Sequence, residues 1–207
     1  MFVSANLLSR YHRAARAARI EDVVEKSGAR DAWQVIANGG VFTAAAMGSL
    51  FHPSPLWLAV GAGAIAASTA DTWATEIGTL VAHPPRLITT GTPVAAGTSG
   101  AVTWVGSSAG LAGAILIAII TVFVGWGATA AWAAVVGGVA GSLVDSIAGA
   151  TLQRQQWCER CGKATERLVH SCGTTTRPQG GLGWVDNDVV NALSSLTGAV
   201  IGLMWLW

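Results

Sequence analysis

The chain has 207 residues, of which 52% are hydrophobic and only 11% are charged, and its net charge is +1. An average soluble domain is about 25% charged, so the composition argues against an ordinary soluble globular protein. A net charge so close to zero gives no electrostatic reason to expect nucleic acid as a partner, and we predict none. The 26 glycines favour helices packed in lipid, where small residues let two backbones approach closely.

Residues 1–31 form a basic, polar N-terminal arm in which positive and negative side chains alternate. The arm lacks the continuous apolar stretch of a secretory signal. We interpret it as a solvated arm, and the alternative is a basic helix lying on the membrane surface. The remaining residues, 32–207, form the second predicted unit.

Five apolar segments follow the arm, and each has about 20 residues or more, which is enough to cross a hydrocarbon core of about 30 Å as a helix. They cover residues 32–51, 56–80, 100–125, 128–152 and 188–207. The fold class predicted is therefore an all-α, polytopic bundle of about five transmembrane helices. Two connections are short, and the other two are long loops over residues 79–99 and 153–187.

All 12 lysines and arginines lie in the arm and in the two long loops. With five spans, these three regions fall on one side of the membrane. Cytoplasmic segments carry an excess of Lys and Arg, so we expect the N-terminus and both long loops in the cytoplasm. The expected location is the plasma membrane of a prokaryotic cell.

Four acidic residues lie within the apolar segments or at their edges: Asp71, Glu76, Asp145 and Asp188. A charged side chain at the centre of a transmembrane helix costs about 2.5–3.5 kcal/mol on insertion scales, and such residues commonly mark functional sites. The alternative is a structural role in hydrogen bonds between helices. All four lie toward the predicted cytoplasmic ends, so we expect them to converge on one cavity.

The amides of Asn187 and Asn191 open the last segment on the same side. Carboxylate and amide oxygens are the ligands that Mg²⁺ prefers. We therefore predict a Mg²⁺ site built from Asp71, Glu76, Asp145 and Asp188, with both asparagines assisting. Which carboxylate, if any, acts as a base is left open.

The first long loop contains a candidate phosphate-binding region. Arg86, Thr89 and Thr90 come first, and they are followed by Gly97, Thr98, Ser99 and Gly100 directly before the third apolar segment. Free N–H groups and the positive end of the dipole make a helix N-terminus an anion site. The alternative is an ordinary helix N-cap without a ligand.

The second long loop contains Cys158, Cys161, His170 and Cys172. Three thiols and an imidazole are a ligand set for tetrahedral Zn²⁺, although the His-x-Cys spacing is tighter than in common zinc fingers. We predict a structural zinc ion, and the alternative is a cluster of reduced thiols. A disulfide is not expected in the cytoplasm.

With these residues in place, the chain resembles the family of membrane proteins of unknown function numbered 92, which includes the transmembrane protein 19 group. The resemblance covers roughly residues 30–200. Its ordered motifs are Arg30 to Gln34, Ala37 to Gly40, Ala70 to Gly78, Pro85 to Thr90, Gly97 to Thr103, Gly141 to Ser146, the Cys/His cluster and Asn187 to Asn191. Typical members carry further hydrophobic segments before the first motif, so we expect either a naturally short protein or a start set too far downstream.

The resemblance implies an enzyme, because a plant chloroplast member is a phytyl-phosphate kinase. The favoured hypothesis is thus a Mg²⁺-dependent kinase that converts an isoprenoid phosphate, a membrane lipid, to a prenyl diphosphate with a nucleoside triphosphate. The alternative is a transporter or channel for a small ion, in which a polar path crosses the membrane. A third hypothesis is a non-catalytic scaffold organised around the Cys/His loop.

Overall fold

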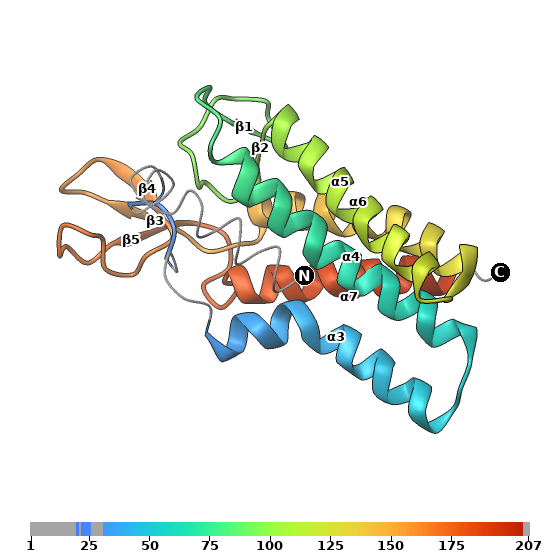
Figure 1. Cartoon of the computed structure of the whole chain (residues 1–207). Helices are drawn as coiled ribbons and strands as arrows, with labels where there is room; N and C mark the ends of the chain where they lie inside the picture. Colours follow the sequence, from blue (N-terminus) through green and yellow to red (C-terminus); the bar gives the residue numbers. More distant parts are fainter. Residues whose placement is uncertain (1–19, 21, 26–30, 205–207) are drawn as a thin grey trace.

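The computed structural model describes residue 20, residues 22–25 and residues 31–204. Within these residues five long helices form a bundle (Figure 1). They are α3 (Ala32–Phe51), α4 (Pro55–Gly78), α5 (Trp104–Phe123), α6 (Gly127–Thr151) and α7 (Asn187–Met204). The predicted helical bundle is therefore confirmed.

Three of the five helices, α3, α5 and α6, are long and apolar enough to cross a membrane. The other two have 24 residues (α4) and 18 residues (α7), or about 36 and 27 Å at 1.5 Å per residue. Helix α4 packs against each of the other four helices. Because its neighbours shield α4, that helix can carry polar side chains that a lipid-facing helix could not.

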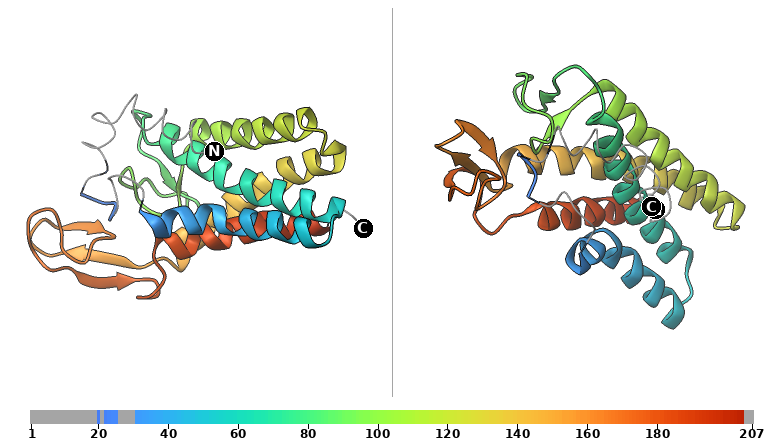
Figure 2. Two further views of the ribbon diagram at one scale, coloured as in Figure 1. Left: turned by 60° about the horizontal axis from the view of Figure 1, so that its bottom comes forward. Right: turned by 60° about the vertical axis from the view of Figure 1, so that its left-hand side comes forward.

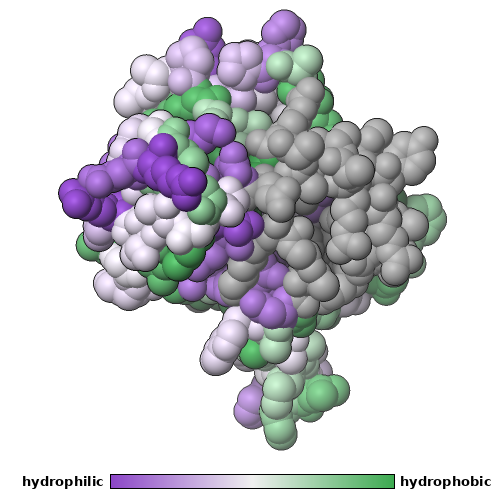
Figure 3. All heavy atoms as spheres, turned by 90° about the vertical axis from the view of Figure 1, so that its left-hand side faces the viewer, coloured by the Kyte–Doolittle hydropathy of each residue, from purple (hydrophilic) through white to green (hydrophobic). Residues whose placement is uncertain are grey.

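The outer surface of the bundle is apolar. Trp104 is 91% exposed, Phe123 is 87% exposed and Leu50 is 81% exposed, together with many aliphatic side chains of the same helices. Exposed apolar surface on this scale marks a contact with protein or membrane. Hydrophilic side chains instead gather at one end of the bundle, which faces the viewer in Figure 3.

Glycines bring α4, α6 and α7 into close contact. A Cβ atom built on Gly137 of α6 would lie 2.8 Å from the carbonyl oxygen of Gly198 on α7 and 3.0 Å from the Cα atom of Gly63 on α4. No side chain fits between backbones this close. The glycines of α6 therefore admit two other helices, as the glycine content of the sequence suggests.

Two small antiparallel sheets occupy the hydrophilic end of the bundle (Figures 1 and 2). In the first long loop β1 (Arg86–Leu87) pairs with β2 (Ala101–Val102). In the second, β3 (Gln155–Cys158), β4 (Lys163–Thr165) and β5 (Arg177–Gly180) form a sheet in the order β4-β3-β5. We call residues 153–185 the cysteine lobe.

The described part of the N-terminal arm, residues 20 and 22–25, packs against the cysteine lobe, and we call it the strap. Ile20 is only 2% exposed. The backbone N–H of Glu166 donates to Val23 O at 2.8 Å, and Thr165 Oγ1 donates to Asp22 O at 2.8 Å. The expectation of a solvated arm is therefore wrong for these residues, because the chain beside β4 supplies hydrogen-bond partners. The rest of the arm lies outside the described residues.

The close contact at Gly137 can be tested with a single methyl group. Gly137→Ala forces a Cβ into the backbone of α7, and overpacking of this kind costs about 1–3 kcal/mol. We expect a lower Tm for the detergent-purified protein. Gly39→Ala on α3 is the matched control, because nothing lies within 4 Å of a Cβ there. Equal Tm values for the two variants would contradict the packing described.

Candidate functional site

A cavity of about 1080 Å³ lies at the hydrophilic end of the bundle, beneath the two sheets. The structure places all six predicted metal-binding or catalytic side chains on its walls. These are Asp71, Glu76, Asp145, Asp188, Asn187 and Asn191. They come from α4, α6 and α7, so the convergence expected from the sequence is present in the fold.

The cavity occupies only one half of the bundle. Its lining begins at Ala70 on α4 and at Val139 on α6, and it ends at Leu111 on α5 and at Asn191 on α7. The other half is filled by an apolar cluster, whose buried members are Ala62, Ala66, Ile117, Ala118, Ala130 and Ala134. Among the described residues, therefore, the polar lining does not continue to the opposite end.

Asp71 and Asp145 are neighbouring acidic residues in the cavity. Their carboxyl groups lie within hydrogen-bonding reach of each other. Asp145 Oδ2 is buried, and no donor among the described residues reaches it. Two carboxylates this close repel each other unless a proton or a cation lies between them. The pair is therefore a natural place for a cation to bind.

Three further acidic residues line the cavity and were not predicted: Glu25, Glu166 and Asp186. Asp186 also caps α7, since its Oδ1 accepts from the N–H groups of Asp188 at 3.0 Å and Val189 at 3.1 Å. The sequence argument looked for carboxylates inside apolar segments. These three lie in the strap, the cysteine lobe and a helix cap, where an acidic residue is unremarkable until the fold is known.

Arg86, Thr89 and Thr90 do not line the cavity, so the structure does not bring them to the predicted phosphate site. Arg86 is exposed, and its Nη1 donates to Gly91 O at 2.7 Å. Thr90 Oγ1 lies 2.7 Å from Thr92 Oγ1. The reason is the pairing of β1 with β2, which directs these side chains into their own turn.

Gly97, Thr98, Ser99 and Gly100 do line the cavity, but they do not directly precede a helix as predicted. Strand β2 intervenes, and the N-cap of α5 is Thr103, whose Oγ1 accepts from Gly106 N at 2.9 Å. The two glycines have φ values of 88° and 74°, which other residues rarely adopt.

This loop instead packs on α6. A Cβ on Gly149 would lie 2.9 Å from Gly100 N, so the loop is held one turn of α6 away from Asp145. The true N-terminus of α5 also faces the cavity, because Thr103, Gly106 and Ser107 line it. Free N–H groups and hydroxyls are thus present beside the carboxylates, although from a different segment than expected.

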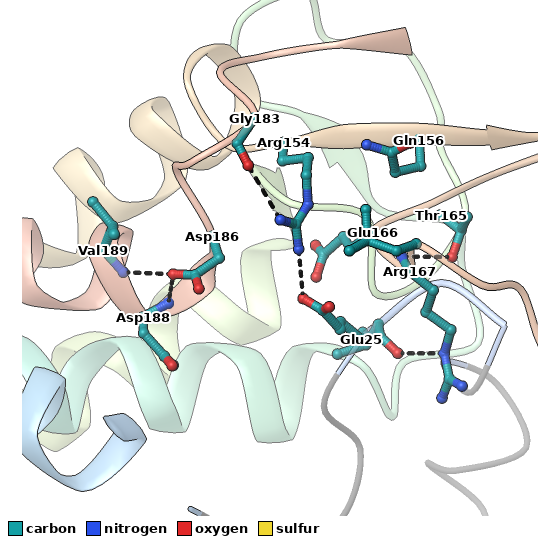
Figure 4. A network of polar contacts seen from close by, with 12 residues as sticks. Glu25, Arg154, Gln156, Thr165, Glu166, Arg167, Gly183, Asp186, Asp188 and Val189 are labelled. Carbon is teal, nitrogen blue, oxygen red and sulfur yellow. Dashed lines mark hydrogen bonds and ion pairs between the residues drawn. The ribbon is translucent and has the colours of Figure 1, made fainter. Parts of the chain in front are cut away.

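A polar network joins the strap to the cysteine lobe (Figure 4), and Ser99 of this loop bonds to the same lobe. Ser99 Oγ donates to Glu166 Oε1, and Arg154 Nη2 forms an ion pair with Glu25 Oε2 at 2.9 Å. Arg154 also donates to Gly183 O at 3.2 Å. Burial raises the pKa of Glu166 to about 7, while the hydrogen bond from Ser99 opposes that shift.

The cysteine lobe brings Cys158, Cys161, His170 and Cys172 together, with their ligand atoms all within 4.8 Å of one another. All three cysteines are free thiols. Hydrogen bonds from Thr174 lower the pKa of Cys172 to about 5, whereas the neighbouring cysteines and burial raise the pKa of Cys161 to about 11. The group has the residue types of a metal site.

An apolar outer surface, a helical bundle and a one-sided acidic cavity define an integral membrane protein with an internal polar site. The chain belongs to the DUF92 family of integral membrane proteins, whose model matches residues 1–199. The family expected from the sequence is therefore confirmed. No solved structure matches the chain.

Three relatives illustrate the family. An uncharacterized membrane protein of Methanocaldococcus jannaschii is 31% identical over 82% of this chain and 60% of its own length. Protein PGR of Arabidopsis thaliana is 35% identical over 65% of this chain and 49% of its own length. An uncharacterized membrane protein of Synechocystis is 30% identical over 80% of this chain and 56% of its own length. The matched region thus spans about half to three fifths of these relatives.

The raised pKa of Glu166 predicts a pH-dependent stability. Between its ordinary value of 4.5 and about 7, the folded protein holds the proton more tightly than the unfolded chain. Stability from this group is therefore lost as the pH rises through that window. The shift corresponds to about 3 kcal/mol at most.

Glu166→Gln removes this titration and keeps an acceptor for Ser99. In buffer without added divalent metal ions, we expect the variant to gain Tm over wild type at pH 8 relative to pH 5. Thermal unfolding of both proteins across this range gives the comparison. Parallel pH curves for the two would show that Glu166 is not a buried, proton-binding group.

Proposed function

We propose that the chain is a Mg²⁺-dependent phosphotransferase that transfers a phosphoryl group from a nucleoside triphosphate to an isoprenoid phosphate. One observation carries the proposal. The described lining of the cavity holds seven carboxyl groups and no lysine, arginine or histidine. The seven are those of Glu25, Asp71, Glu76, Asp145, Glu166, Asp186 and Asp188.

Such a lining repels phosphate unless cations neutralise it. Divalent metal ions supply that charge, and phosphoryl transfer relies mainly on positioning and charge neutralisation. We assign the metal-binding role to Asp71 and Asp145, which are neighbours in the cavity, with Glu76 and Asp188 on the adjoining walls. The amides of Asn187 and Asn191 add neutral oxygen ligands or contacts to bound water.

Uncharged donors on the opposite wall suit the phosphate oxygens. Thr98 and Ser99 belong to the loop packed on α6, Thr103 is the N-cap of α5, and Ser107 lies near the start of that helix. Hydroxyl groups and free backbone N–H groups at a helix N-terminus stabilise anions without adding a full charge. An incoming lipid phosphate is already anionic and needs no general base.

A lateral opening favours a lipid substrate. Leu111 of α5 and Val139 and Leu143 of α6 line the cavity, and they are also 44%, 36% and 50% exposed on the outer surface of the bundle. We infer from this combination that the cavity opens toward the lipid-facing surface between α5 and α6. An isoprenoid chain fits this arrangement, with its phosphate among the carboxylates and its tail in the bilayer.

The one-sided cavity argues against the alternative of a transporter or channel, which needs a polar path to the opposite end. Arg154, Arg160, Lys163, Arg167 and Arg177 all belong to the cysteine lobe. By the positive-inside rule, we propose that this end faces the cytoplasm, where nucleotides are found, in the plasma membrane of a prokaryotic cell.

A product assay tests the proposal directly. Purified protein is given Mg²⁺, prenyl phosphates of several lengths, and ATP or CTP, and we expect a prenyl diphosphate from at least one pair. Asp145→Asn should lower kcat by more than about 100-fold, the scale seen when one group that stabilises the transition state is lost.

Asp31→Asn is the matched control, because Asp31 is an exposed carboxylate at the N-cap of α3 and Asn caps helices equally well. It should retain wild-type rates. Absence of product with every lipid and nucleotide, or an Asp145→Asn variant as active as wild type, would refute the proposed function.

The lateral opening makes a separate prediction about chain length. Leu143→Trp places a larger ring at the opening between α5 and α6. We expect a higher KM for long prenyl phosphates and little change for a short one. Trp132, on the other half of α6, is exposed to lipid and lines no part of the cavity, so Trp132→Leu is the control. Equal effects of Leu143→Trp on both lipids would show that the prenyl chain does not lie in the opening between α5 and α6.

A further inference from the structure

The four candidate metal ligands of the cysteine lobe lie on two turns that bring their ligand atoms together. Cys158 ends β3, and Cys161 lies in the turn before β4, where Gly162 has a φ of 61° and donates its N–H to Cys158 O at 2.8 Å. His170 and Cys172 lie on a second turn, closed by a hydrogen bond from Gly173 N to His170 O at 2.8 Å. Backbone geometry thus presents two ligands from each turn.

The distances suit a tetrahedral ion. Cys158 Sγ lies 3.6 Å from Cys172 Sγ, and His170 Nδ1 lies 3.2 Å from Cys172 Sγ. Zn–S bonds of about 2.3 Å give sulfur–sulfur edges of about 3.8 Å in a tetrahedron. A disulfide needs sulfurs about 2.05 Å apart, so this separation fits a shared metal and not a bond between the thiols.

The lobe has little else to hold it together. Cys158 is fully buried and His170 is 3% exposed, while most of the other buried side chains of the lobe are polar. Its strands have only three or four residues each. Small units that cannot build a hydrophobic core commonly depend on a structural metal.

The contacts between lobe and strap come from the chain segment between the four ligands. Lys163 Nζ pairs with Asp22 Oδ2 at 3.0 Å, and Ser171 Oγ donates to Asp22 Oδ1 at 2.6 Å. Thr165 Oγ1 donates to Asp22 O at 2.8 Å. Three residues of the strap, Ile20, Val24 and Glu25, in turn line the acidic cavity.

We propose that Cys158, Cys161, His170 and Cys172 bind one structural Zn²⁺ ion, which fixes the cysteine lobe so that it holds the strap over the acidic cavity. The ion has no role in chemistry here, because four protein ligands leave no open position for substrate. The inference stands on the lobe alone and does not depend on the proposed phosphotransferase activity.

Metal analysis of the full chain is the first test. The protein is purified in detergent without chelator, and elemental analysis should find one zinc per chain. Cys158→Ser and Cys172→Ser should lose the zinc. Ser171→Ala, which changes an exposed side chain between two ligands, should retain it, and so should His83→Ala, which changes a histidine outside the cluster.

Two measurements on the wild-type protein avoid any dependence on the folding of the cysteine variants. Replacement of zinc by Co²⁺ should give the thiolate charge-transfer and intense d–d bands of a tetrahedral site. A strong chelator should accelerate proteolytic cleavage ahead of Ala32, and added zinc should reverse that effect. Ser171→Ala should accelerate cleavage while keeping its zinc, which separates the strap contact from metal binding.

Several outcomes would overturn the inference. They are wild-type protein without stoichiometric zinc, iron in its place, zinc content unchanged by Cys172→Ser, and cleavage rates that do not respond to the chelator.

Discussion

The structure depends on the close contact of three helix backbones at Gly63, Gly137 and Gly198. Because glycine leaves room for neighbouring backbones, α6 and α7 approach the central helix α4 and shield it from lipid. A shielded helix can carry Asp71 and Glu76 without exposing them to hydrocarbon. Gly149, further along α6, likewise admits the loop that forms the opposite wall of the cavity. The close packing at small residues therefore makes the acidic site possible.

The second constraint is electrostatic. Seven carboxyl groups meet in a cavity whose described lining offers no cationic side chain. Arg154 lies close by, but its guanidinium is engaged with Glu25 and with the backbone of Gly183. Repulsion among the carboxylates is relieved by protons or by metal ions. Glu166 relieves part of it by binding a proton near neutral pH, and we propose that divalent cations bind among the other carboxylates.

Much of the architecture was predictable from the sequence, because apolar segments of about 20 residues and buried acidic residues are strong local signals. The convergence of Asp71, Glu76, Asp145 and Asp188 followed from their places toward the same ends of the apolar segments. The errors lie in the loops. The pairing of β1 with β2 moved the start of α5 to Trp104 and turned Arg86 away from the cavity, and strand pairs of two residues leave no pattern in a sequence. Glu25 and Glu166 were missed because only tertiary contacts carry them to the site.

The central claim is that the acidic cavity binds divalent cations through the pair Asp71 and Asp145. Titration of the purified protein with Mn²⁺ in buffer free of other divalent ions, followed by electron paramagnetic resonance, measures this directly and needs no knowledge of the substrate. The account predicts saturable Mn²⁺ binding that Mg²⁺ displaces and that the double variant Asp71→Asn, Asp145→Asn loses. Mn²⁺ binding that is absent in wild type, or unchanged in the folded double variant, would contradict it.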